Sequence, residues 1–152
     1  MRPLFFMLAF FFFLASCTPP TPVAEEPATA KNVILLIGDG MGLAQLSTAY
    51  YYGDSTPNFS RFPFVGLHQP QPSGAKITDS AAGATAFSTG FKSFNSAIGV
   101  SADSSAQETL LEIAASMDKK TGVIATSSIT HATPASFFAH VVNRNFHEDI
   151  AL

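Results

Sequence analysis

The chain has 152 residues, of which 47% are hydrophobic and 12% are charged. Eight Lys and Arg residues stand against eleven Asp and Glu residues, which gives a formal net charge of −3 at pH 7. The sequence has no run of basic residues and no internal repeat, so neither a basic nucleic-acid-binding surface nor a repeat architecture is expected.

The first seventeen residues, MRPLFFMLAFFFFLASC, have the organisation of a signal peptide. Arg2 precedes an apolar run, Leu4–Leu14, which is shorter than the roughly 20 residues of a membrane span. A permanent N-terminal anchor helix is the less favoured alternative. The run ends in LASC, which resembles the lipobox of bacterial lipoproteins, where the cysteine is lipidated and becomes the new N-terminus. Cys17 is the only cysteine of the chain and has no intramolecular disulfide partner, which also favours acylation.

A polar segment follows the signal peptide. Residues 18–30, TPPTPVAEEPATA, contain four prolines and cannot bury a core, so we expect an extended, flexible tether. Residues 31–152 are numerous enough for one compact unit. The expected protein is thus extracytoplasmic and anchored to a bacterial membrane through Cys17, in the periplasm or on the cell surface.

Short apolar runs in this unit predict buried strands. Asn32–Ile37, NVILLI, is continuously apolar, which is typical of a strand buried on both faces of a parallel sheet. Val65–His68 and Val123–Thr126 are further candidate strands. Helices are predicted between them over Leu43–Tyr52, over residues 80–90, and after a capping box at Ser105–Glu108. The alternation of strand and helix predicts the α/β class.

Asp39 lies at the carboxyl end of the first predicted strand, after Gly38, in the sequence IGDGMG. Asp-Gly is a common turn dipeptide, so an ordinary turn is one interpretation. The other is a ligand site, because the carboxyl ends of buried parallel strands are where open α/β sheets bind ligands. A carboxylate at that edge can bind a divalent metal ion through hard oxygen atoms. The motif alone leaves both interpretations open.

Ser80 is placed at the start of a predicted helix, within TDSAAGATAFSTG. A hydroxyl there lies beside unpaired backbone N–H groups, where an anion or an ionising oxygen nucleophile is stabilised. The small residues at 81–84 leave room for a tetrahedral phosphate and let the helix pack closely. The alternative is that Asp79 or Ser80 only caps the helix.

Three segments, IGDGMG, TDSAAGATAFSTGFKSFNSAIGV and THATPASFFAHVVNR, occur in this order and together resemble the alkaline phosphatases over residues 31–147. The resemblance implies hydrolysis of phosphate monoesters through a phosphoserine, with two zinc ions and usually one magnesium ion. It also implies part of a doubly wound sheet with helices on both faces, and a homodimer.

Carried over by position, the resemblance assigns Ser80 as the nucleophile and Asp39 as the carboxylate that bridges one zinc ion and the magnesium ion. Ser80 and Thr133 would be further metal ligands. Asp79 would orient Arg144, whose planar fork can hold two phosphate oxygens at once.

Two histidines near these motifs have different interpretations. Members of the family carry either Asp or His at the position of His131, and imidazole is a poorer partner than carboxylate for magnesium and its waters. The third metal site is therefore expected to be weaker, water-mediated or occupied by another ion. The alternative for His131 is a loop histidine bonded to the backbone. His140 lies in the apolar stretch FFAHVV and is interpreted as a core histidine with satisfied hydrogen bonds.

Residues 31–152 contain too few His and acidic residues for two catalytic zinc sites, and the sequence ends in EDIAL, which resembles the start of a helix. We therefore expect the N-terminal portion of a longer catalytic domain, inactive by itself. The alternatives are a related phosphodiesterase or sulfatase on the same scaffold, and a surface lipoprotein that binds phosphate without turnover.

Overall fold

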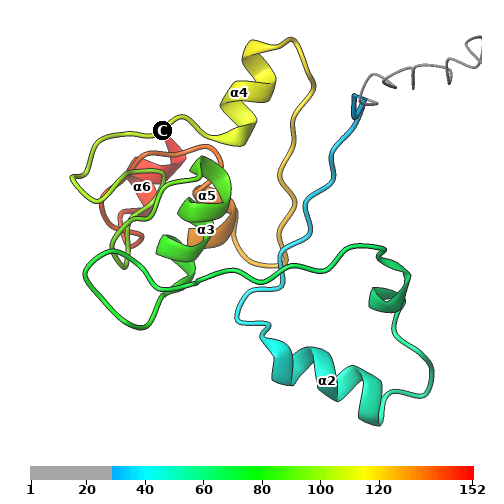
Figure 1. Cartoon of the computed structure of the whole chain (residues 1–152). Helices are drawn as coiled ribbons and strands as arrows, with labels where there is room; N and C mark the ends of the chain where they lie inside the picture. Colours follow the sequence, from blue (N-terminus) through cyan, green and yellow to red (C-terminus); the bar gives the residue numbers. More distant parts are fainter. Residues whose placement is uncertain (1–28) are drawn as a thin grey trace, which may run out of the picture. The chain divides into compact units, whose positions relative to one another are not determined.

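The computed structural model describes residues 29–152 (Figure 1). The predicted signal peptide, Cys17 and nearly all of the predicted tether lie outside the described residues. The chain divides into two units, residues 1–36 and 37–152, and the site is built from the second. Within the described part, no helix has the length and hydropathy needed to cross a membrane.

Helices make up the regular structure of the described residues. They are α2 (Leu43–Tyr52), the short 3₁₀ helix η1 (Asn58–Arg61), α3 (Ser80–Thr89), α4 (Leu110–Ser116), α5 (Ala132–Ala135) and α6 (His147–Ala151). The structure confirms the predicted helix over Leu43–Tyr52 and the helix that begins at Ser80.

Helix α3 has well-defined signals at both ends. Asp79 is the N-cap residue, and its Oδ1 accepts a hydrogen bond from the Ala82 backbone N–H at 2.9 Å. At the other end Gly90 adopts a left-handed conformation with φ 79°, which only glycine adopts without steric cost. These caps let a segment rich in Ser, Thr and Gly form a helix in spite of its low propensity.

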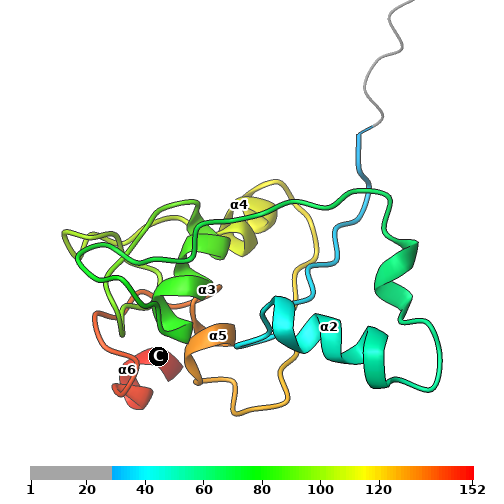
Figure 2. The same ribbon diagram turned by 60° about the horizontal axis from the view of Figure 1, so that its bottom comes forward.

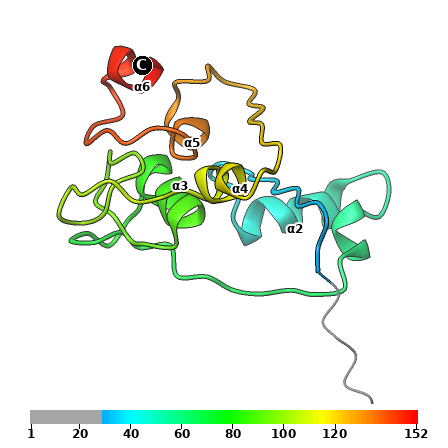
Figure 3. The same ribbon diagram turned by 90° about the horizontal axis from the view of Figure 1, so that it is seen from above.

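Small side chains let α3 and α5 pack closely. The two helices lie side by side, and α3 also contacts α4 (Figures 1 and 3). Figure 2 shows α3 and α5 adjacent from another direction. Their interface belongs to a core of buried, mostly small residues, namely Ala81, Ile98, Ala132, Ala135, Ala139 and Ile150. The abundance of alanine after Ser80 is therefore explained by helix packing.

A buried hydroxyl ties α3 to the segment that follows it. Thr85 Oγ1 donates to the carbonyl of Ala97 and accepts from the N–H of Gly99, both at 3.0 Å. Ile98, between them, exchanges two backbone hydrogen bonds of 2.8 Å with Val141. The chain around Ile98 is thus held by α3 on one side and by the segment after α5 on the other.

The predicted sheet is not formed by the described residues. Asn32–Ile37, Val65–His68 and Val123–Thr126 have no strand assignment, and Ile34, Val65 and Ile124 are 84%, 93% and 100% exposed. A strand requires backbone hydrogen bonds to a neighbour, and the only bridges among the described residues are Ile98–Val141 and Val100–Ala106. The three apolar segments therefore have no partner strand among the described residues.

The predicted capping box was placed four residues too early. The box that begins α4 is formed by Thr109 and Glu112, each side chain bonding the other's backbone N–H. Ser105 is instead held in a turn, where its carbonyl accepts from the Ser101 N–H at 2.9 Å. Bridging of Val100 with Ala106 keeps this stretch extended and delays the helix.

His140 is hydrogen-bonded through both ring nitrogens, as its interpretation as a satisfied histidine predicted. Nδ1 lies 2.8 Å from the Gly99 carbonyl oxygen, and Nε2 lies 2.9 Å from Oε1 of Glu112. Partial burial disfavours the charged ring, but these two acceptors outweigh it and raise the pKa of His140. Burial by itself would raise the pKa of the Glu112 carboxyl, but hydrogen bonds from His140 and Thr109 outweigh this effect and lower that pKa.

This pair predicts a pH-dependent stability. The raised His140 pKa stabilises the fold fully below the ordinary value of 6.5, and this contribution is lost as pH rises through the folded value. The lowered Glu112 pKa stabilises the fold above 4.5 and is lost as pH falls. Glu112→Gln keeps a capping side chain but removes the charge. It should lower Tm by roughly 2 °C more at pH 5.5 than at pH 8.5, since the pair is partly exposed.

Thermal unfolding of the variant at both pH values checks this expectation. Glu148→Gln, on the exposed first turn of α6, is the matched control and should show no such difference. Equal destabilisation by Glu112→Gln at the two pH values would contradict the ion pair.

Candidate active site

Asp39 lies in a tight turn and accepts hydrogen bonds from two distant segments. The Met41 N–H donates to the Gly38 carbonyl at 3.1 Å, and Gly40 has φ 68°, so the turn depends on glycine. Asp39 Oδ1 accepts from Ser80 Oγ at 2.9 Å, and Oδ2 accepts from Thr133 Oγ1 at 3.0 Å. Asp39 therefore forms a turn, as the first interpretation held, and also brings two predicted site residues together.

The side chains of Asp39, Ser80 and Thr133 present a set of hard oxygen atoms. Asp39 is exposed, while Ser80 and Thr133 are half-buried, so the carboxylate is open to solvent and to a ligand. This donor set suits magnesium or another hard divalent cation. No cluster of three or more His, Cys, Asp or Glu side chains occurs among residues 29–152, so the described part assembles no zinc site alone.

Arg144 is held by Asp79 and His131. Its Nη1 lies 3.3 Å from Oδ2 of Asp79, and its Nη2 lies 3.3 Å from Nε2 of His131. Both members of the ion pair are about one quarter exposed, at 24% and 26% for the two side chains. A guanidinium only donates hydrogen bonds, so Nε2 of His131 is the acceptor in this contact. The alternative of a backbone-bonded loop histidine does not describe this arrangement.

The same Asp79 side chain also caps α3, so the two groups of site residues are linked. Ser80 is the first residue of the helix that Asp79 caps, and its hydroxyl points to Asp39. The structure thus brings the predicted residues into two adjoining groups, Asp39–Ser80–Thr133 and Asp79–Arg144–His131. Their chemical roles remain predictions from the resemblance.

Two residues of this site were missed by the sequence analysis. Oδ1 of Asn95 accepts from the Asp79 N–H at 3.1 Å, and the Ser96 N–H donates to Asp79 Oδ2 at 2.9 Å. The available signal was the Asn-Ser dipeptide shortly after α3, since both residue types are frequent in turns. That signal predicts a turn but does not indicate what the turn contacts.

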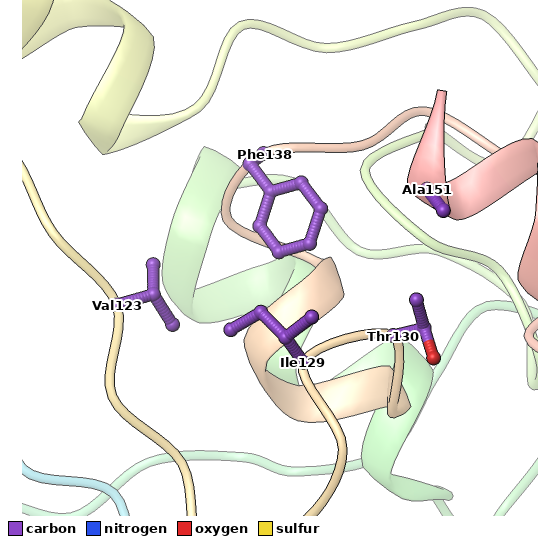
Figure 4. Close-up of a pocket in the computed structure, with 5 residues that line it drawn as sticks. All are labelled: Val123, Ile129, Thr130, Phe138 and Ala151. Atoms are coloured by element: carbon purple, nitrogen blue, oxygen red, sulfur yellow. The ribbon is translucent and has the colours of Figure 1, made fainter.

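The structure also has a pocket of about 370 Å³ (Figure 4). It is lined by Val123, Ile129, Thr130, Phe138 and Ala151. The lining is apolar apart from the Thr130 hydroxyl and includes none of the predicted site residues, so the pocket does not coincide with the candidate site.

Comparison with known proteins places these motifs in one family. A family model described as alkaline phosphatase matches residues 30–152. Alkaline phosphatase 3 of Bacillus subtilis (strain 168) is 42% identical over 152 residues, covering 91% of this chain and 33% of that protein. The alkaline phosphatase of Escherichia coli (strain K12) is 39% identical over 132 residues, covering 80% of this chain and 28% of that protein. The chain spans about a third of the length of these relatives.

Solved structures show the same relationship. The alkaline phosphatase from the Antarctic bacterium TAB5 has 55% sequence identity and a TM-score of 0.72, over 74% of this chain and 33% of that chain. A cold-active alkaline phosphatase from a psychrophilic Shewanella sp. has 39% identity and a TM-score of 0.69, over 76% and 31% of the two chains. A histidine-to-aspartate variant of the TAB5 enzyme has Mg bound in its M3 site.

Proposed function

The chain belongs to the alkaline phosphatase family, and we propose that the protein hydrolyses phosphate monoesters through a covalent phosphoserine at Ser80. The observation that carries the proposal is the linked arrangement of Ser80, Asp39, Asp79 and Arg144. Ser80 donates to Asp39 at 2.9 Å, and the preceding residue forms the ion pair with Arg144. A nucleophile and a cationic phosphate clamp are thereby connected through adjacent residues of the chain.

Ser80 carries out the covalent step. Its oxygen, at the N-terminal end of the ten-residue helix α3, gains stabilisation as it loses its proton. The oxygen attacks phosphorus, the bond from phosphorus to the alcohol oxygen breaks, and the alcohol leaves. A water molecule then attacks the phosphoserine, releases inorganic phosphate and restores the Ser80 hydroxyl.

Arg144 holds the phosphate oxygens. A guanidinium has five N–H donors in a planar fork, and contacts with Asp79 and His131 fix its plane while leaving further donors available. A fixed fork binds a tetrahedral dianion with less loss of side-chain entropy than a free arginine would.

Asp39, Ser80 and Thr133 would hold metal ions in this part of the site through their side-chain oxygen atoms. When bound, such ions neutralise charge on the phosphate and activate the attacking oxygen and water. The family resemblance supports two zinc ions and a magnesium ion, and the Mg-bound TAB5 variant supports the magnesium. His131 lies beside Arg144. A role of His131 in the third metal site is part of the proposal.

The proposal includes the architecture of the catalytic domain. The similar solved structures are alkaline phosphatases, which have an α/β fold. The exposed apolar segments Asn32–Ile37, Val65–His68 and Val123–Thr126 support a doubly wound sheet in which they are buried strands, with helices on both faces. By the same resemblance, the assembled enzyme is a homodimer.

Location follows from the N-terminal sequence. The apolar run before LASC and the proline-rich segment after it support a lipoprotein anchored through Cys17, outside the cytoplasm. Such an anchor would hold the phosphatase at the membrane surface.

Ser80→Ala should lower kcat for a simple monoester by roughly 10³-fold or more, because the covalent step loses its nucleophile. Steady-state turnover of p-nitrophenyl phosphate by the full-length protein measures this. Ser47→Ala, on the exposed face of α2, is the matched control and should keep wild-type turnover. A Ser80→Ala variant with more than a tenth of the wild-type kcat would remove Ser80 from the nucleophile role.

Arg144→Ala should weaken inhibition by inorganic phosphate roughly 10- to 150-fold, the equivalent of losing about 1.5–3 kcal/mol of charge-assisted hydrogen bonding. The inhibition constant of phosphate measures this directly. Arg61→Ala, an exposed arginine of η1, serves as the control and should leave the constant unchanged. Unchanged phosphate inhibition in Arg144→Ala would show that another group clamps the phosphate.

Cys17→Ser should abolish incorporation of a fatty-acid analogue and release the protein from the membrane fraction. Metabolic labelling followed by fractionation measures both effects. A wild-type protein that is unlabelled and cleaved at another residue would indicate an ordinary secretory signal.

A further inference from the structure

A turn after α3 contacts Asp79 and Arg144 of the candidate site and the segment that leads into Ser80. The side chain of Asn95 is bonded on both of its polar atoms: Oδ1 accepts from the Asp79 N–H at 3.1 Å, and Nδ2 donates to the Ile77 carbonyl at 3.0 Å. Ile77 and the helix cap Asp79 lie on either side of Thr78, in the segment that enters α3. Asn95 therefore fixes the path by which the chain enters α3 and presents Ser80.

The next residue, Ser96, reaches the arginine side of the site through its backbone. Its N–H donates to Asp79 Oδ2 at 2.9 Å, and its carbonyl accepts from the Arg144 N–H at 2.8 Å. Ser96 has φ 75°, in the left-handed region that disfavours side chains. In this conformation the N–H of Ser96 bonds to Asp79 and its carbonyl bonds to the backbone of Arg144.

The turn itself is anchored by the buried segment that follows. Ala97, Ile98 and Gly99 are fully or almost fully buried, and they bond to α3 through Thr85 and to Val141 through the Ile98 bridge. The C-terminal end of the turn is therefore held in place by this segment. By contrast, the Asn95 side chain is exposed, where a hydrogen bond contributes little to global stability because water competes for it.

We propose that Asn95 is a positioning residue that sets the geometry between the nucleophile Ser80 and the clamp Arg144, acting through Asp79. This inference rests on the proposed phosphatase function. Asp79 is bonded to Asn95 through its backbone and to Ser96 and Arg144 through its carboxylate. Loss of the Asn95 contacts lets the segment before Ser80 shift while the Ser96 contacts still hold the arginine side.

The test is Asn95→Ala in the full-length protein. We expect kcat for p-nitrophenyl phosphate to fall roughly tenfold, as two hydrogen bonds are lost on the serine side, with KM and phosphate inhibition changed less than about threefold. Tm should stay within about 2 °C of the wild-type value, because the side chain is exposed. Asn95→Asp keeps an acceptor for the Asp79 N–H and should recover part of the lost kcat.

Asn58→Ala, at the exposed start of η1, is the matched control and should change neither kcat nor Tm. A wild-type kcat in Asn95→Ala would overturn the proposal. A loss of activity accompanied by a Tm decrease of several degrees, without recovery in Asn95→Asp, would also overturn it in favour of a purely structural role.

Hydrogen exchange separates this inference from the proposed function. The Asp79 amide should exchange about tenfold faster in Asn95→Ala than in the wild type, whether or not the wild type hydrolyses a monoester. An inactive wild type with this faster exchange would refute the phosphatase proposal but support the positioning contact. Unchanged exchange at Asp79 would refute the positioning contact even in an active enzyme.

Discussion

The carboxylate of Asp79 is the interaction on which the order of the site depends. One oxygen caps α3 through the Ala82 N–H, and the other accepts from Ser96 and pairs with Arg144. Helix capping and a role in phosphate binding are competing explanations when the sequence is considered alone. In the structure both explanations involve the same side chain, because Asp79 caps the helix and also pairs with Arg144.

Close packing of α3 on α5 brings two hydroxyl groups within hydrogen-bond distance of the Asp39 carboxylate. Ser80 begins α3 and Thr133 lies in the short helix α5, and alanines at positions 81, 132 and 135 form the buried contact between the helices. Because alanine adds little bulk, both hydroxyls can reach one carboxylate at 2.9 and 3.0 Å. A larger side chain in this interface would separate the hydroxyls or force the helices apart, since well-packed interiors tolerate added volume poorly.

The structure brings together the residues that the sequence motifs singled out, but the sequence specified the surrounding backbone less well. Ser80, Asp79 and Arg144 lie in distinctive motifs, and the structure joins them. Asn95 and Ser96 were missed because part of their contribution is made by backbone atoms, directed by a φ of 75° that the residue types do not specify. Apolar runs such as Asn32–Ile37 indicate burial, but a strand also needs a neighbour to accept its hydrogen bonds. Two consecutive capping-box patterns, Ser105–Glu108 and Thr109–Glu112, precede or begin α4, and the turn at Ser105 leaves Thr109 as the cap.

The connections within the site are made by caps, turns and one backbone bridge. Arg144 is fixed at its guanidinium by Asp79 and His131 and at its backbone by Ser96, while the Ile98–Val141 bridge holds the segments on either side. All these contacts lie within residues 37–152. The local geometry around Ser80 and Arg144 thus requires no strand ladder among the described residues. Asp39 differs from these residues, because only Gly38 separates it from the apolar run Asn32–Ile37, which is largely exposed in the structure. Formation of a sheet around that run would therefore act on the site chiefly through Asp39, by fixing the carboxylate to which Ser80 and Thr133 donate.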